Sequence, residues 1–222
     1  MKKTAIILGA TGLTGTILLQ KLIEDERYTS IKLFSRSKIE GVPNKVTQFI
    51  GDLLKLAQFK ADFTADEVYC CIGTTAKKTP HKKLYKQIDY GIPVTAAKLS
   101  KENNIPTFLV VSAMGANKNS RVFYNKTKGE MEQDVLQQHI KNTYIVRPSL
   151  IGGERKERRV LEKIGITIFK VIEPLFIGKL KEYKMINAES IALAMIHLAN
   201  NARHAEVIIT SSELKQISKQ QV

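Results

Sequence analysis

The chain has 222 residues, 43% of them hydrophobic, and its 35 Lys and Arg against 21 Asp and Glu give a formal net charge of +14. No stretch approaches the ~18 uninterrupted apolar residues of a membrane helix, and the apolar run at residues 6–8 is too short for a signal-peptide core. The two cysteines, Cys70 and Cys71, are adjacent in an apolar run, so they are expected on opposite faces of a strand and unable to bond each other readily. No Cys/His spacing is typical of a metal site, so we expect no bound metal. The length fits a single domain over residues 1–222. Because the two cysteines cannot readily bond each other, we expect the protein in a reducing cytoplasm.

The basic residues are spread along the chain, with local concentrations at Lys77–Lys78, Lys82–Lys83 and Arg155–Arg159. The interleaving of basic and aromatic residues that is typical of an RNA-binding module is missing from the sequence. A basic solvated surface is the preferred interpretation, and binding to nucleic acid is disfavoured. An anionic cofactor or substrate would also gain from this positive field.

Strand patterns and helix patterns alternate along the chain, which predicts an α/β fold with a doubly wound parallel sheet and crossover helices. Strands are expected at Thr4–Leu8, Ile31–Ser35, Val46–Ile50, Val68–Ile72, Thr107–Val111, Thr143–Val146 and Val207–Thr210. Helices are expected at Thr14–Glu24, Leu84–Asn103, Val122–Gln138, Glu157–Lys170 and Ala188–Asn200. Because Pro93 lies inside the second helical pattern, that helix is expected to start after Asp89 or to bend at Tyr90–Gly91. Residues 152–185 are left as a small C-terminal substrate cover.

The first predicted strand runs directly into three glycines with the spacing G-x-x-G-x-x-G, and a helical pattern follows at once. A phosphate site needs this order, because a helix N-terminus offers free N–H groups and a positive dipole. Gly9 would allow the tight turn, Gly12 would let the backbone approach a pyrophosphate, and Gly15 would let the helix pack close to the strand. The predicted phosphate-binding residues are Gly9, Thr11, Gly12, Leu13, Thr14 and Gly15. The alternative is an ordinary strand-turn-helix with glycine punctuation.

The second predicted strand ends at Ser35-Arg36, where an acidic residue would hydrogen-bond the ribose hydroxyls of NAD. Arg36 instead suits a 2′-phosphate, with Ser35, Ser37 or Lys38 as helpers. The sequence therefore favours NADP over NAD. A surface arginine at the start of a loop is the alternative.

Two further strand ends carry candidate cofactor contacts. Asp52, followed by Leu53, could accept from the adenine amino group, or it could cap a short helix instead. Gly73 and Thr74 follow the fourth strand, where the backbone could pass close to the cofactor. A plain turn is the alternative there.

Candidate chemistry lies in Ser112, Tyr124 and Lys128. A tyrosine and a lysine four apart share one helix face, and the ammonium would lower the phenol pKa from ~10 toward working pH. The phenol could then exchange a proton with a carbonyl/alcohol pair while hydride moves. Ser112, at the end of the preceding strand, could hold the substrate oxygen. The alternative is a surface tyrosine on a basic helix.

Together the sequence Gly9-Ala10-Thr11-Gly12-Leu13-Thr14-Gly15, the serine strand, Tyr124-x-x-x-Lys128 and Arg147-Pro148 resemble the atypical short-chain dehydrogenase/reductases over nearly the whole length. The segments 71–75 and 128–132 are most similar to the Tat-interacting-protein oxidoreductase branch. The resemblance implies a Rossmann fold and an NADP-type cofactor. It also implies Tyr124 as acid/base, Lys128 on the nicotinamide ribose, Ser112 as substrate anchor, and Arg147-Pro148 beside the nicotinamide.

The chain departs from this family at two points. Many relatives carry asparagine where this chain has Asp89, which puts a proton relay through that position in doubt. Only a short region follows Pro148, which disfavours a sugar-nucleotide epimerase.

The expected function is an NADP(H)-dependent oxidoreductase acting on a small carbonyl or alcohol. An NADP(H)-binding redox sensor without turnover is the alternative, and a basic nucleic-acid-associated protein is the third hypothesis. The cations of the loop Thr75–Lys83 could draw an anionic substrate or could belong to a mobile solvated loop, in which His81 is expected to be a surface residue. The stretch Ile164–Ile177 could cover the site or form a homodimer contact.

Overall fold

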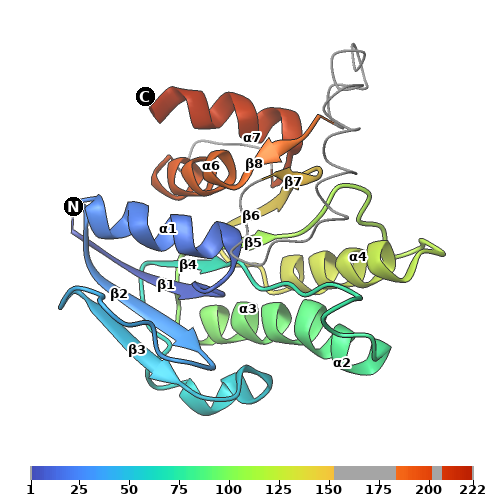
Figure 1. Ribbon diagram of the computed structural model, residues 1–222. Helices are drawn as coiled ribbons and strands as arrows, with labels where there is room; N and C mark the ends of the chain where they lie inside the picture. Colours follow the sequence, from blue (N-terminus) through green and yellow to red (C-terminus); the bar gives the residue numbers. More distant parts are fainter. Residues whose placement is uncertain (1, 153–183, 202–206, 222) are drawn as a thin grey trace.

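The computed structural model describes residues 2–152, 184–201 and 207–221, and its centre is a parallel sheet of seven strands (Figure 1). The strands are β1 (Lys3–Leu8), β2 (Tyr28–Ser35), β3 (Val46–Ile50), β4 (Glu67–Cys70), β5 (Thr107–Val111), β6 (Asn142–Arg147) and β9 (Ile208–Thr210). Their order is β3-β2-β1-β4-β5-β6-β9, so the direction of winding reverses between β1 and β4. The predicted doubly wound α/β fold is confirmed, and ligands of such sheets bind where this reversal opens the carboxyl edge.

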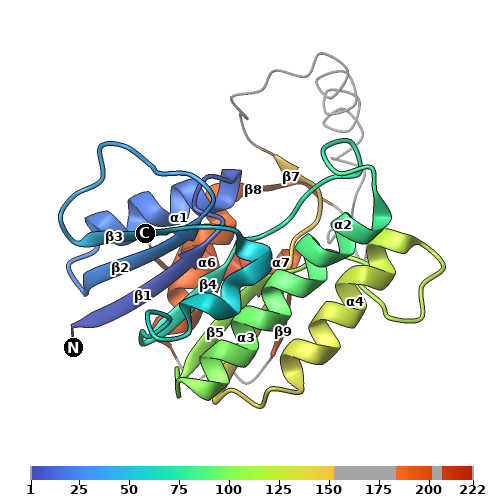
Figure 2. The same cartoon turned by 90° about the horizontal axis from the view of Figure 1, so that it is seen from below.

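Helices cover both faces of the sheet. One face carries α1 (Leu13–Glu24), α6 (Ala188–Asn200) and α7 (Ser211–Ser218). The other carries the 3₁₀ segment η1 (Leu53–Phe59), α3 (Ile92–Glu102) and α4 (Phe123–Leu136), which Figure 2 shows in front of the strands. Along β1, Ala5 and Ile7 pack into the first layer while Ile6 and Leu8 pack into the second. Side chains that alternate between two buried faces explain why the strand reads as an unbroken apolar run.

The helical stretch that contains Pro93 is continuous but changes its winding. It consists of α2 (Lys82–Lys86), the single π-helical turn η2 (Gln87–Gly91) and α3. The Ile92 N–H donates to the Gln87 carbonyl, five residues back, and Pro93 has no N–H with which to continue an α-helical ladder. The helix therefore starts at Lys82, earlier than predicted, and widens at the proline.

Three other features differ from the sequence-based expectations. β4 ends at Cys70 rather than Ile72, because the chain turns away after the Cys71 N–H has bonded the Leu8 carbonyl. Helix α7 was not predicted, although Thr210 and Glu213 form its capping box. A short parallel pair, β7 (Ile151–Gly152) with β8 (Ile186–Asn187), was also not predicted. The predicted helix Glu157–Lys170 and most of the predicted cover 152–185, including Ile164–Ile177, lie outside the described residues.

The two cysteines occupy opposite faces of the sheet, as predicted. Cys70 is buried with the α3 and α4 layer and Cys71 packs against the α1 layer, and neither forms a disulfide. In the part of the chain that the structure describes, no helix has both the length and the apolar character to cross a membrane.

Candidate active site

The glycine turn joins β1 to α1 by close approach of backbone to backbone. Gly9 has φ +86°, and a Cβ on it would lie 2.8 Å from the Cys71 carbonyl oxygen. A Cβ on Gly15 would lie 2.1 Å from the Gly9 carbonyl oxygen, so only glycine fits there. Gly12 is the N-cap of α1 and offers no side-chain cap. The first N–H groups of α1 therefore face the carboxyl edge without a capping side chain, as a phosphate cradle requires.

The ends of β2 and β3 place the other predicted nucleotide contacts. Arg36 is exposed immediately after β2, while buried Ser35 donates its hydroxyl to the Ser37 carbonyl at 2.8 Å. Asp52 accepts from the Leu54 N–H at 3.0 Å and caps η1, and Leu53 is buried behind it. The capping alternative for Asp52 is therefore what the structure contains, and a contact to adenine stays a prediction.

Ser112 and Arg147 both bond the buried carboxylate of Glu132. The Ser112 hydroxyl donates to Glu132 Oε1 at 2.5 Å, and Arg147 donates to both carboxylate oxygens, at 2.9 and 2.5 Å. The hydrogen bond to Glu132 is the main reason that the pKa of Arg147 is raised. This cluster ties β5, α4 and β6 together, and Pro148 follows it, accepting the Met114 N–H through its carbonyl. The roles of Ser112 as substrate anchor and of Arg147-Pro148 beside the nicotinamide stay predictions.

Lys128 forms a buried ion pair with Asp89. The Lys128 ammonium lies 3.0 Å from Asp89 Oδ1, with 4% and 1% of the two side chains exposed. The other carboxylate oxygen, Oδ2, accepts from the Thr74 N–H at 2.7 Å. Asp89 therefore joins the loop after β4 to helix α4, a connection that the sequence did not predict.

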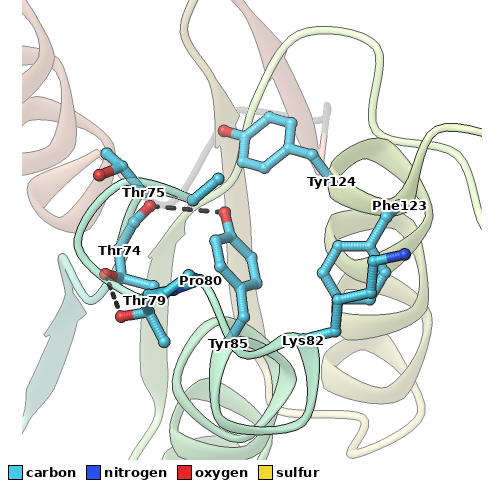
Figure 3. Close-up of a pocket in the computed structure, with 9 residues that line it drawn as sticks. Thr74, Thr75, Thr79, Pro80, Lys82, Tyr85, Phe123 and Tyr124 are labelled. Atoms are coloured by element: carbon cyan, nitrogen blue, oxygen red, sulfur yellow. Dashed lines mark hydrogen bonds between the residues drawn. The ribbon is translucent and has the colours of Figure 1, made fainter.

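A cavity of about 440 Å³ opens at the carboxyl edge beside these groups. Figure 3 shows Tyr124 from α4 and Tyr85 from α2 with their hydroxyl ends toward the loop that carries Thr74 and Thr75, and Tyr85 bonds the Thr74 carbonyl. The lining residues are Thr74, Thr75, Ala76, Thr79, Pro80, Lys82, Tyr85, Phe123 and Tyr124. A site of this size with a mostly apolar wall and a few hydroxyl groups suits a small organic substrate.

The electrostatics at Tyr124 differ from the expectation. Desolvation raises the pKa of Tyr124, Lys128 lowers it and Asp89 raises it again, so the pKa lies above its ordinary value. The predicted lowering is therefore wrong for this structure, because burial of the phenol raises its pKa more than Lys128 lowers it, and Asp89 adds to the increase. For Lys128, burial lowers the pKa, but the charges of Asp89 and Tyr124 leave it raised.

The structure brings some of the predicted residues together and leaves others apart. Tyr124 and Thr74 line the cavity, Lys128 lies buried behind it, and Ser112 is not part of its wall. The sequence did not point to Tyr85 or Phe123, since both look like ordinary apolar positions of helices. Asp89 was noticed only as a departure from the family.

A glycine cradle at the winding reversal of a parallel sheet, beside a cavity with a tyrosine, defines a dinucleotide-binding protein of the Rossmann class. Comparison with known families agrees, because the NAD(P)H-binding family matches residues 9–168. The chain belongs to this family and is an atypical short-chain dehydrogenase/reductase.

Relatives support the assignment over most of the length. Protein FMP52, mitochondrial, of Debaryomyces hansenii is 31% identical, and the match covers 89% of this chain and 88% of the relative. Protein HTATIP2 of Rattus norvegicus is 30% identical over 75% of this chain and 70% of the relative. The resemblance to the Tat-interacting-protein branch is thus confirmed. The naming of several fungal relatives as mitochondrial contradicts the predicted cytoplasmic location, which had been inferred from two cysteines that cannot readily bond each other.

Solved structures share the fold at low sequence identity. UDP-glucose 4-epimerase from Thermotoga maritima aligns with a TM-score of 0.68 and 14% identity, over 98% of this chain and 82% of the epimerase. The Bordetella bronchiseptica enzyme WbmH, in complex with NAD⁺, aligns with a TM-score of 0.69 and 12% identity, over 94% of this chain and 75% of the enzyme. At this identity the likeness concerns the fold, and function has to be argued from the site.

Proposed function

We propose that this protein is an NADP(H)-dependent oxidoreductase of a small carbonyl or alcohol, working from a single dinucleotide-binding domain. The observation that carries the proposal is Tyr124, which borders the 440 Å³ cavity and is followed one helical turn later by Lys128. The glycine turn lies at the same edge of the sheet and fits the phosphates of the cofactor. Coenzyme and proton donor would thus meet at one cavity.

The chemistry follows from these positions. A bound reduced nicotinamide supplies the hydride. Tyr124 gives its phenolic proton to the carbonyl oxygen as the carbonyl carbon accepts hydride, and water then reprotonates the tyrosinate. Lys128 contributes positive charge near the phenol, and buried Tyr85 and Thr79 on the cavity wall limit access of water from that side. The exposed Lys82 on this wall favours a substrate with an anionic group.

Preference for NADP(H) rests on Arg36. Its exposed guanidinium lies directly after β2 and makes no hydrogen bond or ion pair within the described residues, so it is available to a 2′-phosphate. Titration calorimetry should give NADPH an affinity at least about tenfold above that of NADH, since a charge-assisted hydrogen bond contributes about 1.5–3 kcal/mol. Arg36→Glu should remove this preference.

Lys98→Glu is the matched control, because it changes the net charge equally at an exposed position of α3. It should leave both affinities within about threefold, as screened surface charges have little effect at a distance. Equal loss of NADPH affinity in both variants would assign the preference to net charge rather than to Arg36. Failure of both nucleotides to bind even at millimolar concentration would end the proposal.

A redox sensor without turnover is the second candidate. Two observations favour it: Lys128 is buried against Asp89, and the Ser112 hydroxyl is bonded to Glu132. NADPH oxidation with a panel of small carbonyl compounds, some of them carboxylates, decides between the two. If the protein is an oxidoreductase, we expect turnover that Tyr124→Phe lowers by at least about a hundredfold. NADPH binding without turnover of any compound in the panel would instead support the redox sensor.

A further inference from the structure

Asp89 is a buried carboxylate with an incomplete set of partners. Its side chain is 1% exposed, and Oδ2 accepts from the Thr74 N–H at 2.7 Å. Among the described residues, the partner of Oδ1 is the Lys128 ammonium alone, at 3.0 Å. A buried charge of this kind persists only where an opposite charge offsets its desolvation.

The position of Asp89 comes from the π-helical turn η2. A π-helical turn adds a residue to the helix and reorients the side chains around it. Here the turn precedes Pro93 and leaves Asp89 facing both the loop after β4 and helix α4. The π-helical turn thus determines which groups the Asp89 carboxylate contacts.

Few titratable groups surround the Tyr124 phenol in the described part of the chain. Helix α4 contributes Lys128 and η2 contributes Asp89. Tyr85 of α2 and Cys70 of β4 also face this cluster, and burial raises the pKa of both, to about 11 for Cys70, so both are neutral near pH 7. The charges that act on Tyr124 there are therefore those of Lys128 and Asp89.

We infer that Asp89 is a positioning residue that offsets the charge of Lys128 at Tyr124 and so, together with burial of the phenol, keeps Tyr124 protonated. A phenol donates a proton, as carbonyl reduction requires, whereas alcohol oxidation requires the phenolate as proton acceptor. Tyr124 is thus kept, up to a higher pH, in the protonated form that donates the proton in the reduction direction. This direction rests on the proposed function, but the effect of Asp89 on the phenol does not. The raised pKa of Tyr124, to which Asp89 contributes, agrees with the geometry.

The test is direct titration of Tyr124 in the cofactor-free protein. Protein labelled with ¹³Cζ-tyrosine is followed by NMR from pH 6 to 11, and Tyr124→Phe assigns the resonance. In the wild type, Tyr124 should titrate at a higher pH than an exposed tyrosine. In Asp89→Asn the acid dissociation constant should rise by at least about tenfold, the usual size of the effect of one nearby charge. An unchanged titration in Asp89→Asn would overturn the inference.

Asp134→Asn is the matched control. Asp134 lies on α4, the helix that carries Tyr124, and accepts from the Tyr90 hydroxyl at 2.5 Å. This hydrogen bond is the main reason that the pKa of Tyr90 is raised to about 12. The variant should lower the pKa of Tyr90 and leave Tyr124 unchanged. An equal shift of Tyr124 in Asp134→Asn would show a general effect of charge and would also count against Asp89.

Asp89→Asn leaves Lys128 without its counter-charge and could fail to fold. The double variant Asp89→Asn/Lys128→Met avoids this problem, because it removes both charges and leaves neither partner of the ion pair alone. If Asp89 offsets the charge of Lys128 at Tyr124, the acid dissociation constant of Tyr124 in the double variant should stay within about threefold of the wild-type value. A fall of that constant by about tenfold or more in the double variant would show that the charge of Lys128 acts on Tyr124 without an offset, and it would reject the role of Asp89.

Turnover then tests the direction separately. With a carbonyl substrate from the panel, kcat/KM for reduction should stay level to a higher pH in the wild type than in Asp89→Asn. If no substrate is reduced while the NMR shift is present, the proposed function fails and the effect of Asp89 stands. If a substrate is reduced while the titration of Tyr124 is the same in Asp89→Asn as in the wild type, the proposed function stands and the inference about Asp89 fails.

Discussion

Each edge of the sheet holds a lysine-carboxylate pair with a buried carboxylate, and the two carboxylates differ in how many hydrogen bonds they accept. At the amino edge, where β1 and β4 begin, Lys3 bonds Glu67 at 2.6 Å. Tyr28 and Tyr69 donate to the other Glu67 oxygen at 2.7 and 2.6 Å, and Asn200 of α6 bonds both Lys3 and Tyr28. At the carboxyl edge, the partners of Asp89 within residues 2–152, 184–201 and 207–221 are the Thr74 N–H and the Lys128 ammonium.

This difference separates a structural pair from a chemical one. Both oxygens of the Glu67 carboxylate accept hydrogen bonds, from residues of β1, β2 and β4. Asn200 connects two of these donors to α6, so the carboxylate has a structural role in joining the sheet to that helix. In the carboxyl-edge pair, Asp89 Oδ1 has the Lys128 ammonium as its one partner among the described residues, and the pair lies near Tyr124, whose surface is 39% exposed beside a cavity. A carboxylate with few partners beside a cavity can act electrostatically on a reacting group in that cavity.

The largest expected effect is at the amino edge. Glu67→Ala leaves Lys3 and two buried phenols without their acceptor, so the free energy of unfolding should fall by about 3–5 kcal/mol. Urea denaturation measures it. The neighbouring Asp66→Ala is the control: Asp66 is exposed and bonds only Thr4, so its loss should be about 1 kcal/mol. Equal losses in both variants would contradict the structural role assigned to the buried carboxylate of Glu67.

The carboxyl edge is instead shaped by backbone contact, which Gly15→Ala tests. The new Cβ would meet the Gly9 carbonyl at 2.1 Å, and neither backbone segment can move away freely. We expect a loss of about 1–3 kcal/mol, as for other overpacked sites, together with at least a tenfold weaker affinity for NADPH, because the turn itself has to shift.

Gly41→Ala separates strain from overpacking. Gly41 has φ +73°, but no atom lies within 4 Å of the position that a Cβ would take, so it carries only the left-handed backbone cost of about 1–2 kcal/mol. It should leave NADPH affinity unchanged. Normal NADPH binding by Gly15→Ala would mean that close approach at the turn is not needed for the cofactor.

The fold could be predicted from the sequence because its information is local. Apolar runs, helical periods and the glycine turn each occupy a few neighbouring residues, and the parallel order follows from their alternation. What escaped prediction depended on finer local chemistry: Pro93 widens a helix rather than ending it, and the box formed by Thr210 and Glu213 starts a helix after the last strand.

The site was predicted less completely, because its electrostatics depend on distant partners. One helical turn brings Tyr124 and Lys128 together, and the sequence contains that spacing. The partner of Lys128 comes from another helix, and the partner of Ser112 comes from α4. Whether a lysine activates a phenol depends on such contacts, which residue spacing does not encode.

The smallest expected effect separates the two possible roles of Ser112. In Ser112→Ala, Glu132 keeps both bonds from Arg147, so the free energy of unfolding should fall by only about 1 kcal/mol. Ser100→Ala is the control, since this buried serine bonds only the Ala96 carbonyl of its own helix. If the hydroxyl serves Glu132, kcat/KM should fall less than about tenfold, far below the loss in Tyr124→Phe. A hundredfold fall with unchanged stability would instead make Ser112 the substrate anchor, with its hydroxyl turning from Glu132 to the substrate on binding.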